Sequence, residues 1–160
     1  MRLKKLFYLL MISFTFACSS NSGVEIEEEP SSDYDAINEQ EILDYLADNN
    51  LTATKSASGL YYHIEDEGTG DFPNADASVV VWYKMELIDG TVIEEAPTDG
   101  FIFGLWQVIP GFAEAVRYLR EGGTINAYVP SKLGYGDMSY RSIPANAVLI
   151  FKIKLLRVGN

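Results

Sequence analysis

Alternation of apolar and polar residues over several separate segments limits this chain to a fold built mainly from β-strands. From Gly59 onward, apolar side chains recur at every second position, a period typical of strands with one face against a core. Asp89-Gly90 is a strong signal for a tight hairpin, so neighbouring strands are expected to pair antiparallel. The segments with the clearest alternation are 60–65, 78–88, 125–129 and 147–158.

One segment within this region has helical spacing instead. Pro110 suits the first turn of a helix, and Phe112, Val116 and Leu119 then fall on one face. Gly122-Gly123 is a typical helix stop. Strands, one helix and further strands joined by hairpins predict an α+β domain over residues 59–160, with an antiparallel sheet packed on a single helix.

A separate N-terminal helix is predicted over about residues 36–49. Asn38 and Glu41 have the spacing of a capping box, and Ile42 and Leu46 follow at helical spacing. The apolar stripe is narrow, so the helix could pack on the domain, act as a spacer or contribute to a dimer. Residues 36–58 are therefore expected to be a leader helix and its connection to the domain.

The first 17 residues are typical of an export signal. Three basic residues near the start precede the almost entirely apolar segment 6–17, which is too short to span a bilayer as a stable helix. That segment ends at Cys18, the only cysteine, and resembles the lipobox of bacterial lipoproteins, in which this cysteine carries lipid. Thr15 and Phe16 depart from the usual lipobox, so an ordinary secretory signal is the alternative.

Residues 18–35 are expected to form a flexible tether between this anchor and the helix. They are polar and include an acidic run at 25–29, so they cannot bury enough apolar surface to order themselves. Together with the signal, the tether predicts a lipid-anchored protein of the cell envelope, most simply in the outer membrane and facing the periplasm or the surface. The expected membrane contact is through lipid on Cys18.

The charge balance disfavours nucleic acid as a partner. Twelve basic and 23 acidic residues give a net charge of -11, which repels a phosphate backbone. One cysteine and one histidine, His63 on the polar face of a strand, offer neither an internal disulfide nor a set of metal ligands. We therefore expect no cofactor, and no nucleophile–base set for hydrolysis can be built.

Eight short motifs follow one another across residues 80–151. They are Val80-Val81-Trp82-Tyr83, Asp89-Gly90-Thr91, Gln107-Val108-Ile109-Pro110-Gly111-Phe112, Glu121-Gly122-Gly123, Val129-Pro130, Leu133-Gly134-Tyr135-Gly136, Ile143-Pro144-Ala145-Asn146 and Leu149-Ile150-Phe151. As an ordered set they resemble the FK506-binding (FKBP) family of peptidyl-prolyl cis-trans isomerases. The resemblance implies a curled antiparallel sheet of five to six strands around one short α-helix, and rotation of X-Pro bonds in exported proteins as the activity.

The resemblance also implies a shallow aromatic pocket between the helix and the sheet. The backbone N–H of Ile109 and the hydroxyl of Tyr135 are expected to donate hydrogen bonds to the substrate. The ligands implied are proline-containing polypeptides and FK506-like macrolides. The residues expected at the catalytic centre are Tyr83, Phe101, Ile109, Phe112, Tyr135 and Phe151. Those expected around the bound substrate are Ile93, Glu94, Phe103, Val108 and Ile143.

Two features depart from the family pattern at one end of this pocket. The family usually has Phe-Asp after the hairpin, where this chain has Ile93-Glu94. It often has an arginine in the following loop, but residues 95–100 contain no basic residue. Reduced activity or a shifted substrate preference is therefore predicted, together with two alternatives: a proline-binding module without turnover, or an accessory lipoprotein of an envelope assembly.

Overall fold

The structure, a computed structural model, describes residues 33–159. The predicted signal at 1–17, Cys18 and most of the predicted tether at 18–35 lie outside this range. Within it, none of the helices combines the length and the apolar character needed to cross a membrane.

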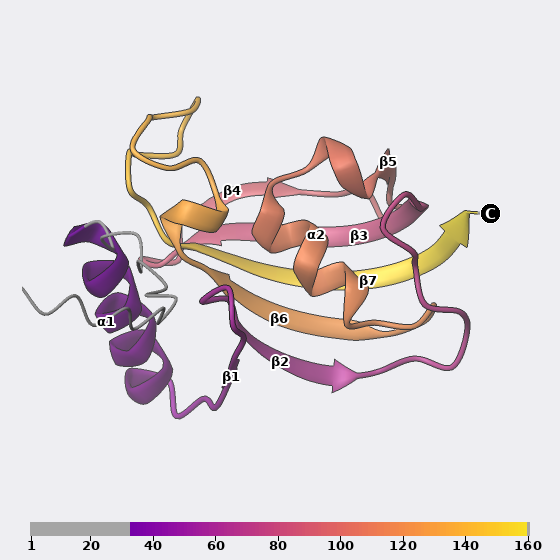
Figure 1. Cartoon of the computed structure of the whole chain (residues 1–160), viewed down its shortest axis with the longest axis horizontal. Helices are drawn as coiled ribbons and strands as arrows, with labels where there is room; N and C mark the ends of the chain where they lie inside the picture. Colours follow the sequence, from indigo (N-terminus) through magenta and orange to yellow (C-terminus); the bar gives the residue numbers. More distant parts are fainter. Residues whose placement is uncertain (1–32, 160) are drawn as a thin grey trace, which may run out of the picture.

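Seven antiparallel strands form one curved sheet (Figure 1). Across the sheet their order is β1-β2-β6-β7-β3-β4, and β5 also pairs with β3. The predicted α+β class is confirmed, with seven strands instead of five to six because a two-residue β1 joins one edge and the return after the hairpin divides into β4 and β5. The strands are β1 (Thr54–Lys55), β2 (Tyr61–Asp66), β3 (Ser78–Leu87), β4 (Val92–Glu95), β5 (Phe101–Gly104), β6 (Thr124–Val129) and β7 (Leu149–Gly159).

The helix α2 (Pro110–Arg117) covers one face of the sheet (Figure 1). As predicted, Phe112, Val116 and Leu119 are buried beneath it, with 4%, 0% and 0% of their surface exposed. They pack on every second residue of β3, β6 and β7, as the period of a strand requires. This assembly is the main core.

The end of α2 differs from the predicted stop at Gly122-Gly123. The helix ends at Arg117, and the N–H groups of Tyr118 and Leu119 bond to carbonyls three residues back, which tightens the last turn. Gly123 instead allows the backbone to pass close to that of Glu67, since a Cβ at position 123 would lie 2.5 Å from the Glu67 carbonyl oxygen.

The helix α1 (Asp33–Asp48) packs on the opposite face of the sheet, at the end away from the C terminus (Figure 1). Ile42 and Leu46 are buried there against Tyr61, Tyr128 and Ile150, whose neighbours along the strands point into the main core. Tyr61 lies on the same face of its strand as His63, the face expected to be polar, yet it is 7% exposed because α1 covers it.

The predicted capping box at the start of α1 is wrong. The helix begins at Asp33, so residues 33–35 are helical and Asn38 lies in its second turn. The Asn38 side chain is used for tertiary contacts: it accepts a hydrogen bond from the Ser131 N–H at 2.8 Å and donates one to the Asn146 carbonyl at 3.0 Å. Asn38 therefore connects α1 to the rest of the domain and does not cap the helix.

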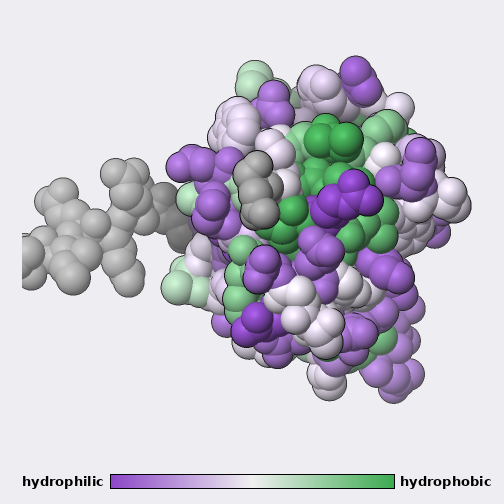
Figure 2. Space-filling model, turned by 90° about the vertical axis from the view of Figure 1, so that its right-hand side faces the viewer, coloured by the Kyte–Doolittle hydropathy of each residue, from purple (hydrophilic) through white to green (hydrophobic). Residues whose placement is uncertain are grey.

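Two short 3₁₀ turns complete the described fold, η1 (Leu105–Gln107) before α2 and η2 (Ser131–Leu133) after β6. Apolar surface gathers at the end of the molecule where β5 and the end of β7 lie (Figure 2). Two residues of β5 are exposed there, Phe101 at 41% and Ile102 at 76%.

Candidate functional site

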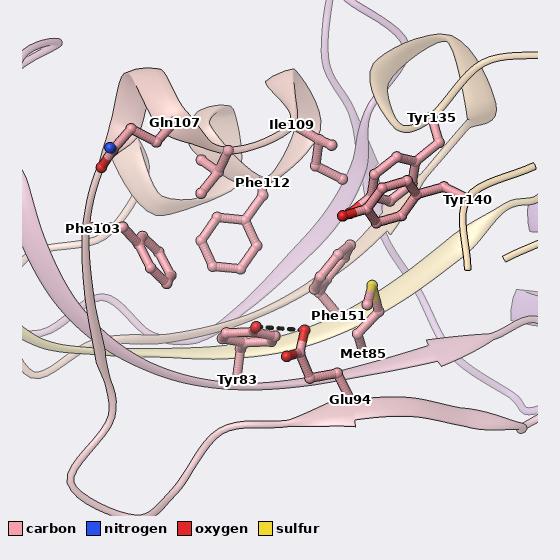
Figure 3. A pocket seen from close by; sticks show the side chains of 11 residues that line it. Tyr83, Met85, Glu94, Phe103, Gln107, Ile109, Phe112, Tyr135, Tyr140 and Phe151 are labelled. Atoms are coloured by element: carbon pink, nitrogen blue, oxygen red, sulfur yellow. Dashed lines mark hydrogen bonds between the residues drawn. The ribbon is translucent and has the colours of Figure 1, made fainter. Parts of the chain in front are cut away.

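A cavity of about 380 Å³ opens between α2, the strands β3 and β7, and the loop after η2 (Figure 3). Its volume lies in the usual range for small-ligand sites. Its lining is mainly aromatic and aliphatic, with few polar groups. The lining residues are Tyr83, Met85, Glu94, Phe103, Gln107, Val108, Ile109, Phe112, Tyr135, Tyr140 and Phe151.

Phe112 forms the floor of the cavity. Its ring contacts those of Phe151, Tyr83 and Phe103 edge to face, with centroids 5.3, 5.4 and 5.7 Å apart. Such edge-to-face pairs each contribute about 0.5–1.5 kcal/mol beyond the burial of their area. Because α2 supplies Phe112, β3 supplies Tyr83 and β7 supplies Phe151, the main core itself fixes this aromatic wall.

The Tyr83 hydroxyl and the Glu94 carboxylate form the polar end of the cavity. The hydroxyl donates a hydrogen bond to Glu94 Oε2 at 2.8 Å (Figure 3). Burial, and then this bond to a carboxylate, raise the pKa of Tyr83 far above its usual range. The phenol is therefore a fixed donor that holds the carboxylate on the cavity wall.

Two hydrogen-bond donors lie at the rim. The backbone N–H of Ile109, the residue just before α2, makes no hydrogen bond with any part of the chain between residues 33 and 159. Tyr135 stacks on Tyr140, with centroids 4.7 Å apart and planes 7° from parallel. Burial, followed by the nearby Tyr140 and Glu94, raises the pKa of Tyr135, so its hydroxyl stays protonated at neutral pH.

The arrangement can bind a compact apolar group and orient a carbonyl at its edge. It lacks a nucleophile with an adjacent base, and within residues 33–159 no group of three or more histidine, cysteine or acidic side chains could hold a metal ion. A sequence model of the FKBP-type peptidyl-prolyl cis-trans isomerase matches residues 70–156, more than half of the chain. The chain belongs to this family.

Individual FKBP-type relatives agree with this assignment. An FKBP-type peptidyl-prolyl cis-trans isomerase FkpA from Aeromonas hydrophila is 42% identical over 131 residues, which are 79% of this chain and 49% of the relative. An outer membrane protein MIP from Legionella longbeachae is 43% identical over 104 residues, 63% of this chain and 45% of the relative. The crystal structure of FkpA from Escherichia coli superposes with a TM-score of 0.69 at 34% identity, covering 77% of this chain and 60% of that one. The chain spans about half the length of the curated relatives it matches.

The structure brings most of the predicted site residues together. Eight of them line the cavity: Tyr83, Glu94, Phe103, Val108, Ile109, Phe112, Tyr135 and Phe151. Glu94, at the end where the chain departs from the family pattern, is among them, and its carboxylate accepts a hydrogen bond from Tyr83 although residues 95–100 contain no arginine.

Three predicted residues do not line the cavity. Phe101 is 41% exposed, with its ring centroid 6.3 Å from that of Tyr83. Ile143 is buried at 3% exposure, and Ile93 packs partly buried against the main core. The resemblance to the family therefore did not distinguish residues that line the cavity from residues that pack behind its walls.

Three lining residues were missed. Met85 shares the inward face of β3 with Tyr83, so the period-two pattern contained its signal. Tyr140, like Tyr135, is a large aromatic residue in a loop, a position that favours a binding role over packing. Gln107 lay within a recognised motif, but its side chain had no assigned task. It accepts a hydrogen bond from the Gly104 N–H at 2.9 Å and so fixes η1.

Proposed function

We propose that this FKBP-type chain catalyses cis–trans isomerisation of X-Pro bonds in polypeptides of the cell envelope. The observation that carries the proposal is the Phe112-floored aromatic cavity, with a tyrosine hydroxyl and an Ile109 N–H unbonded within residues 33–159 at its rim. Family membership supports the same reaction.

The chemistry requires no proton transfer to break a bond. Rotation about an X-Pro bond disrupts amide resonance and takes tens to hundreds of seconds unaided. The twisted amide is less polar than the planar one, so an apolar cavity stabilises it relative to the ground state. Stronger binding of the transition state than of the substrate is what accelerates a reaction.

Each lining residue has a role in this proposal. The proline ring sits on Phe112 between Tyr83, Phe103 and Phe151, while the Ile109 N–H and the Tyr135 hydroxyl donate to substrate carbonyls. Glu94 accepts a hydrogen bond at the polar end, and Val108 borders the exit of the chain. A millionfold acceleration requires about 8 kcal/mol, which burial and two or three such hydrogen bonds can share.

The three predicted residues outside the lining act indirectly. Phe101 offers an exposed apolar contact for the residue before proline, and Ile93 and Ile143 support the wall and the loop from behind. The same cavity is proposed to bind FK506-like macrolides through a proline-like ring.

We further propose that residues 1–17 are a cleaved signal, that residues from 18 to about 32 are a tether, and that Cys18 carries lipid. The apolar segment ending at the single cysteine supports this, as does the name of the Legionella relative. Expressed in a bacterial host, the Cys18→Ser variant is expected to leave the membrane fraction or to remain unprocessed. Fractionation and migration identical to wild type would contradict the anchor.

The activity is tested on residues 19–160, which include the whole described fold. Exchange of a short proline peptide should accelerate in proportion to the protein concentration, and an FK506-like macrolide should inhibit it. If a well-folded protein gives no acceleration at high concentration but still binds the peptide, the chain is a proline-binding module.

A further inference from the structure

A second and larger cavity adjoins the proline-binding one. It has a volume of about 660 Å³ and runs along the solvent-facing side of α2. The two cavities share Val108 in their linings, so they meet at that residue. The second cavity, here called the α2 groove, is bordered by Trp106, Val108, Pro110, Glu114, Arg117 and Leu133.

Trp106 is the most unusual residue of the α2 groove. Tryptophan has the largest side chain of all residues and a mainly apolar one, yet 63% of Trp106 is exposed. The six-membered ring covers Gly104 so closely that a Cβ there would lie 2.4 Å from an indole carbon. Glycine at this position thus allows the indole to lie flat on the backbone.

The turn that carries Trp106 is fixed on both sides. Leu105 is 1% exposed, and its N–H donates to the Ala77 carbonyl at 3.2 Å. The Gly104 N–H donates to Gln107 Oε1 at 2.9 Å. A tryptophan held in place before binding loses little conformational entropy when it contacts a ligand, and tryptophan is enriched among residues that dominate binding energy.

The polar groups of the α2 groove indicate which kind of side chain it accepts. The Glu114 carboxylate already accepts hydrogen bonds from the Ser58 hydroxyl at 2.6 Å and the Tyr118 hydroxyl at 2.9 Å. The exposed Arg117 also borders the groove, and its charge acts on Glu114, helping to lower the pKa of that carboxyl. The rest of the surface left for contact is the indole of Trp106 and the aliphatic groups of Val108, Pro110 and Leu133. An apolar or aromatic side chain therefore fits better than a charged one.

The position of the α2 groove identifies the molecule that brings this side chain. Ile109, with its unbonded N–H, lies at the rim of the proline cavity and next to Val108. A chain whose carbonyl is bound at that N–H has the α2 groove directly beside it, across Val108. We propose that the α2 groove binds an apolar or aromatic side chain, a few residues from the proline, of the same polypeptide whose proline occupies the cavity. This inference rests on the proposed isomerase function.

The first test compares kcat/KM for three peptides: a short proline tetrapeptide, and two longer peptides that carry either phenylalanine or serine three residues from the proline. Trp106→Ala should lower kcat/KM for the phenylalanine peptide about three- to tenfold, the range expected for losing one aromatic contact. For the other two peptides the change should be less than about twofold, because they place nothing on the indole. Trp106→Phe should restore most of the loss. An equal effect of Trp106→Ala on all three peptides would overturn the inference.

The second test measures binding without catalysis. The chain has two tryptophans, Trp82 and Trp106, so Trp82→Phe leaves Trp106 as the only tryptophan reporter and Trp106→Phe is its matched control. Titration with the phenylalanine peptide should shift the emission of the Trp82→Phe variant to shorter wavelength and saturate. The serine peptide should shift it less, and the control variant should not respond.

The two tests separate the possible failures. A wild-type protein that does not isomerise even the tetrapeptide contradicts the proposed function. In that case the fluorescence titration still decides the α2 groove, since equal responses to the phenylalanine and serine peptides would overturn it. Isomerisation of all three peptides without discrimination by Trp106 rejects the groove alone.

Discussion

The two helices lie on opposite faces of one sheet and are held there in different ways. α2 buries Phe112 and Val116 in the main core, so its contacts with the sheet are mainly apolar. α1 buries Ile42 and Leu46, but its other anchors are polar, including the Asn38 side chain and an ion pair between Glu39 and Lys55. The face under α2 forms the aromatic cavity, whereas two hollows beside α1, within residues 33–159, each have a single aromatic residue in their lining.

The polar contacts of α1 show how a helix that does not line the cavity can still influence its shape. The Asn38 side chain bonds to Ser131 and to Asn146, the two ends of the loop that carries Tyr135 and Tyr140. The backbone of Gly136 is bonded to both of these residues as well. α2 therefore builds the cavity directly, while α1 is positioned to hold its loop in place.

Phe112→Ala should have the largest effect, because it removes both the floor of the cavity and a core side chain. The free energy of unfolding should fall by about 3–5 kcal/mol, and isomerisation should be lost. Phe112→Trp is the matched control, since it keeps an aromatic ring at the floor of the cavity. Urea unfolding and peptide exchange measure the two effects, and an active Phe112→Ala protein would contradict the assignment of the floor.

Asn38→Ala should have an intermediate effect, because it leaves a buried Ser131 N–H and the Asn146 carbonyl without their partner. We expect a loss of about 1–3 kcal/mol in the free energy of unfolding. Amide hydrogen exchange at Ser131 should accelerate, and the isomerisation rate should fall as the loop loosens. Gln40→Ala, on the exposed side of the same helix, is the control. If Asn38→Ala and Gln40→Ala behave alike, α1 does not position the loop.

Lys55→Ala should have a smaller effect, even though Lys55 pairs with Glu39 and lies over the ring of Tyr61. Both partners of the ion pair are more than 40% exposed, and exposed pairs contribute about 0–1 kcal/mol. The isomerisation rate should not change. A destabilisation as large as that of Asn38→Ala would show that the ion pair, and not the buried amide, holds α1.

Alkaline pH should have the smallest effect on activity in the physiological range. The pKa of Tyr135 is raised by burial, so its hydroxyl remains a donor until the pH exceeds the ordinary tyrosine value of about 10. The isomerisation rate should therefore not fall between about pH 7 and pH 9. A decline in this interval, measured on folded protein, would contradict a protonated Tyr135 hydroxyl as the donor.

The free energy of unfolding should decrease at strongly alkaline pH. The pKa of Tyr118 is raised to about 12 by burial and by its hydrogen bond to Glu114. A raised tyrosine pKa stabilises the fold at pH values below the unfolded value of about 10, and this contribution is lost as the pH rises towards 12. Circular dichroism across this interval should show unfolding together with ionisation of the buried phenols.

The fold was largely predictable because the residues of the main core recur at every second position of their strands. Val79, Val81, Tyr83 and Met85 lie at every second position of β3, on the face opposite Lys84 and Glu86, and the structure buries all four. The second apolar cluster was not predicted. Tyr61 and Tyr128 lie on faces that look polar from the strand pattern, and only the docking of α1 from outside the domain buries them.

Agreement between the family resemblance and the period of a strand or helix predicted most of the cavity wall. Tyr83, Phe112 and Phe151 satisfied both and line the cavity, but Phe101 satisfied both as well and lies outside the lining, 41% exposed. Ile143 matched the motif but packs behind the loop, because which side of a loop faces a cavity depends on tertiary contacts absent from the sequence pattern. The hydrogen bond from Tyr83 to Glu94 was not predicted either. The family pattern has aspartate at this position, and the sequence does not show whether the longer glutamate side chain also contacts the phenol.

The central claim is that the Phe112-floored cavity catalyses X-Pro rotation with the Tyr135 hydroxyl as a donor. Its most direct test is cis–trans exchange of a short proline peptide, measured by NMR with residues 19–160, for wild type and Tyr135→Phe, with Tyr34→Phe as an exposed tyrosine control. We predict an acceleration proportional to wild-type concentration, unchanged in Tyr34→Phe. In Tyr135→Phe it should be several-fold weaker, as the loss of about 0.5–1.5 kcal/mol implies. Equal rates for wild type and Tyr135→Phe would contradict the role of that hydroxyl, and no acceleration by folded wild type would contradict the claim as a whole.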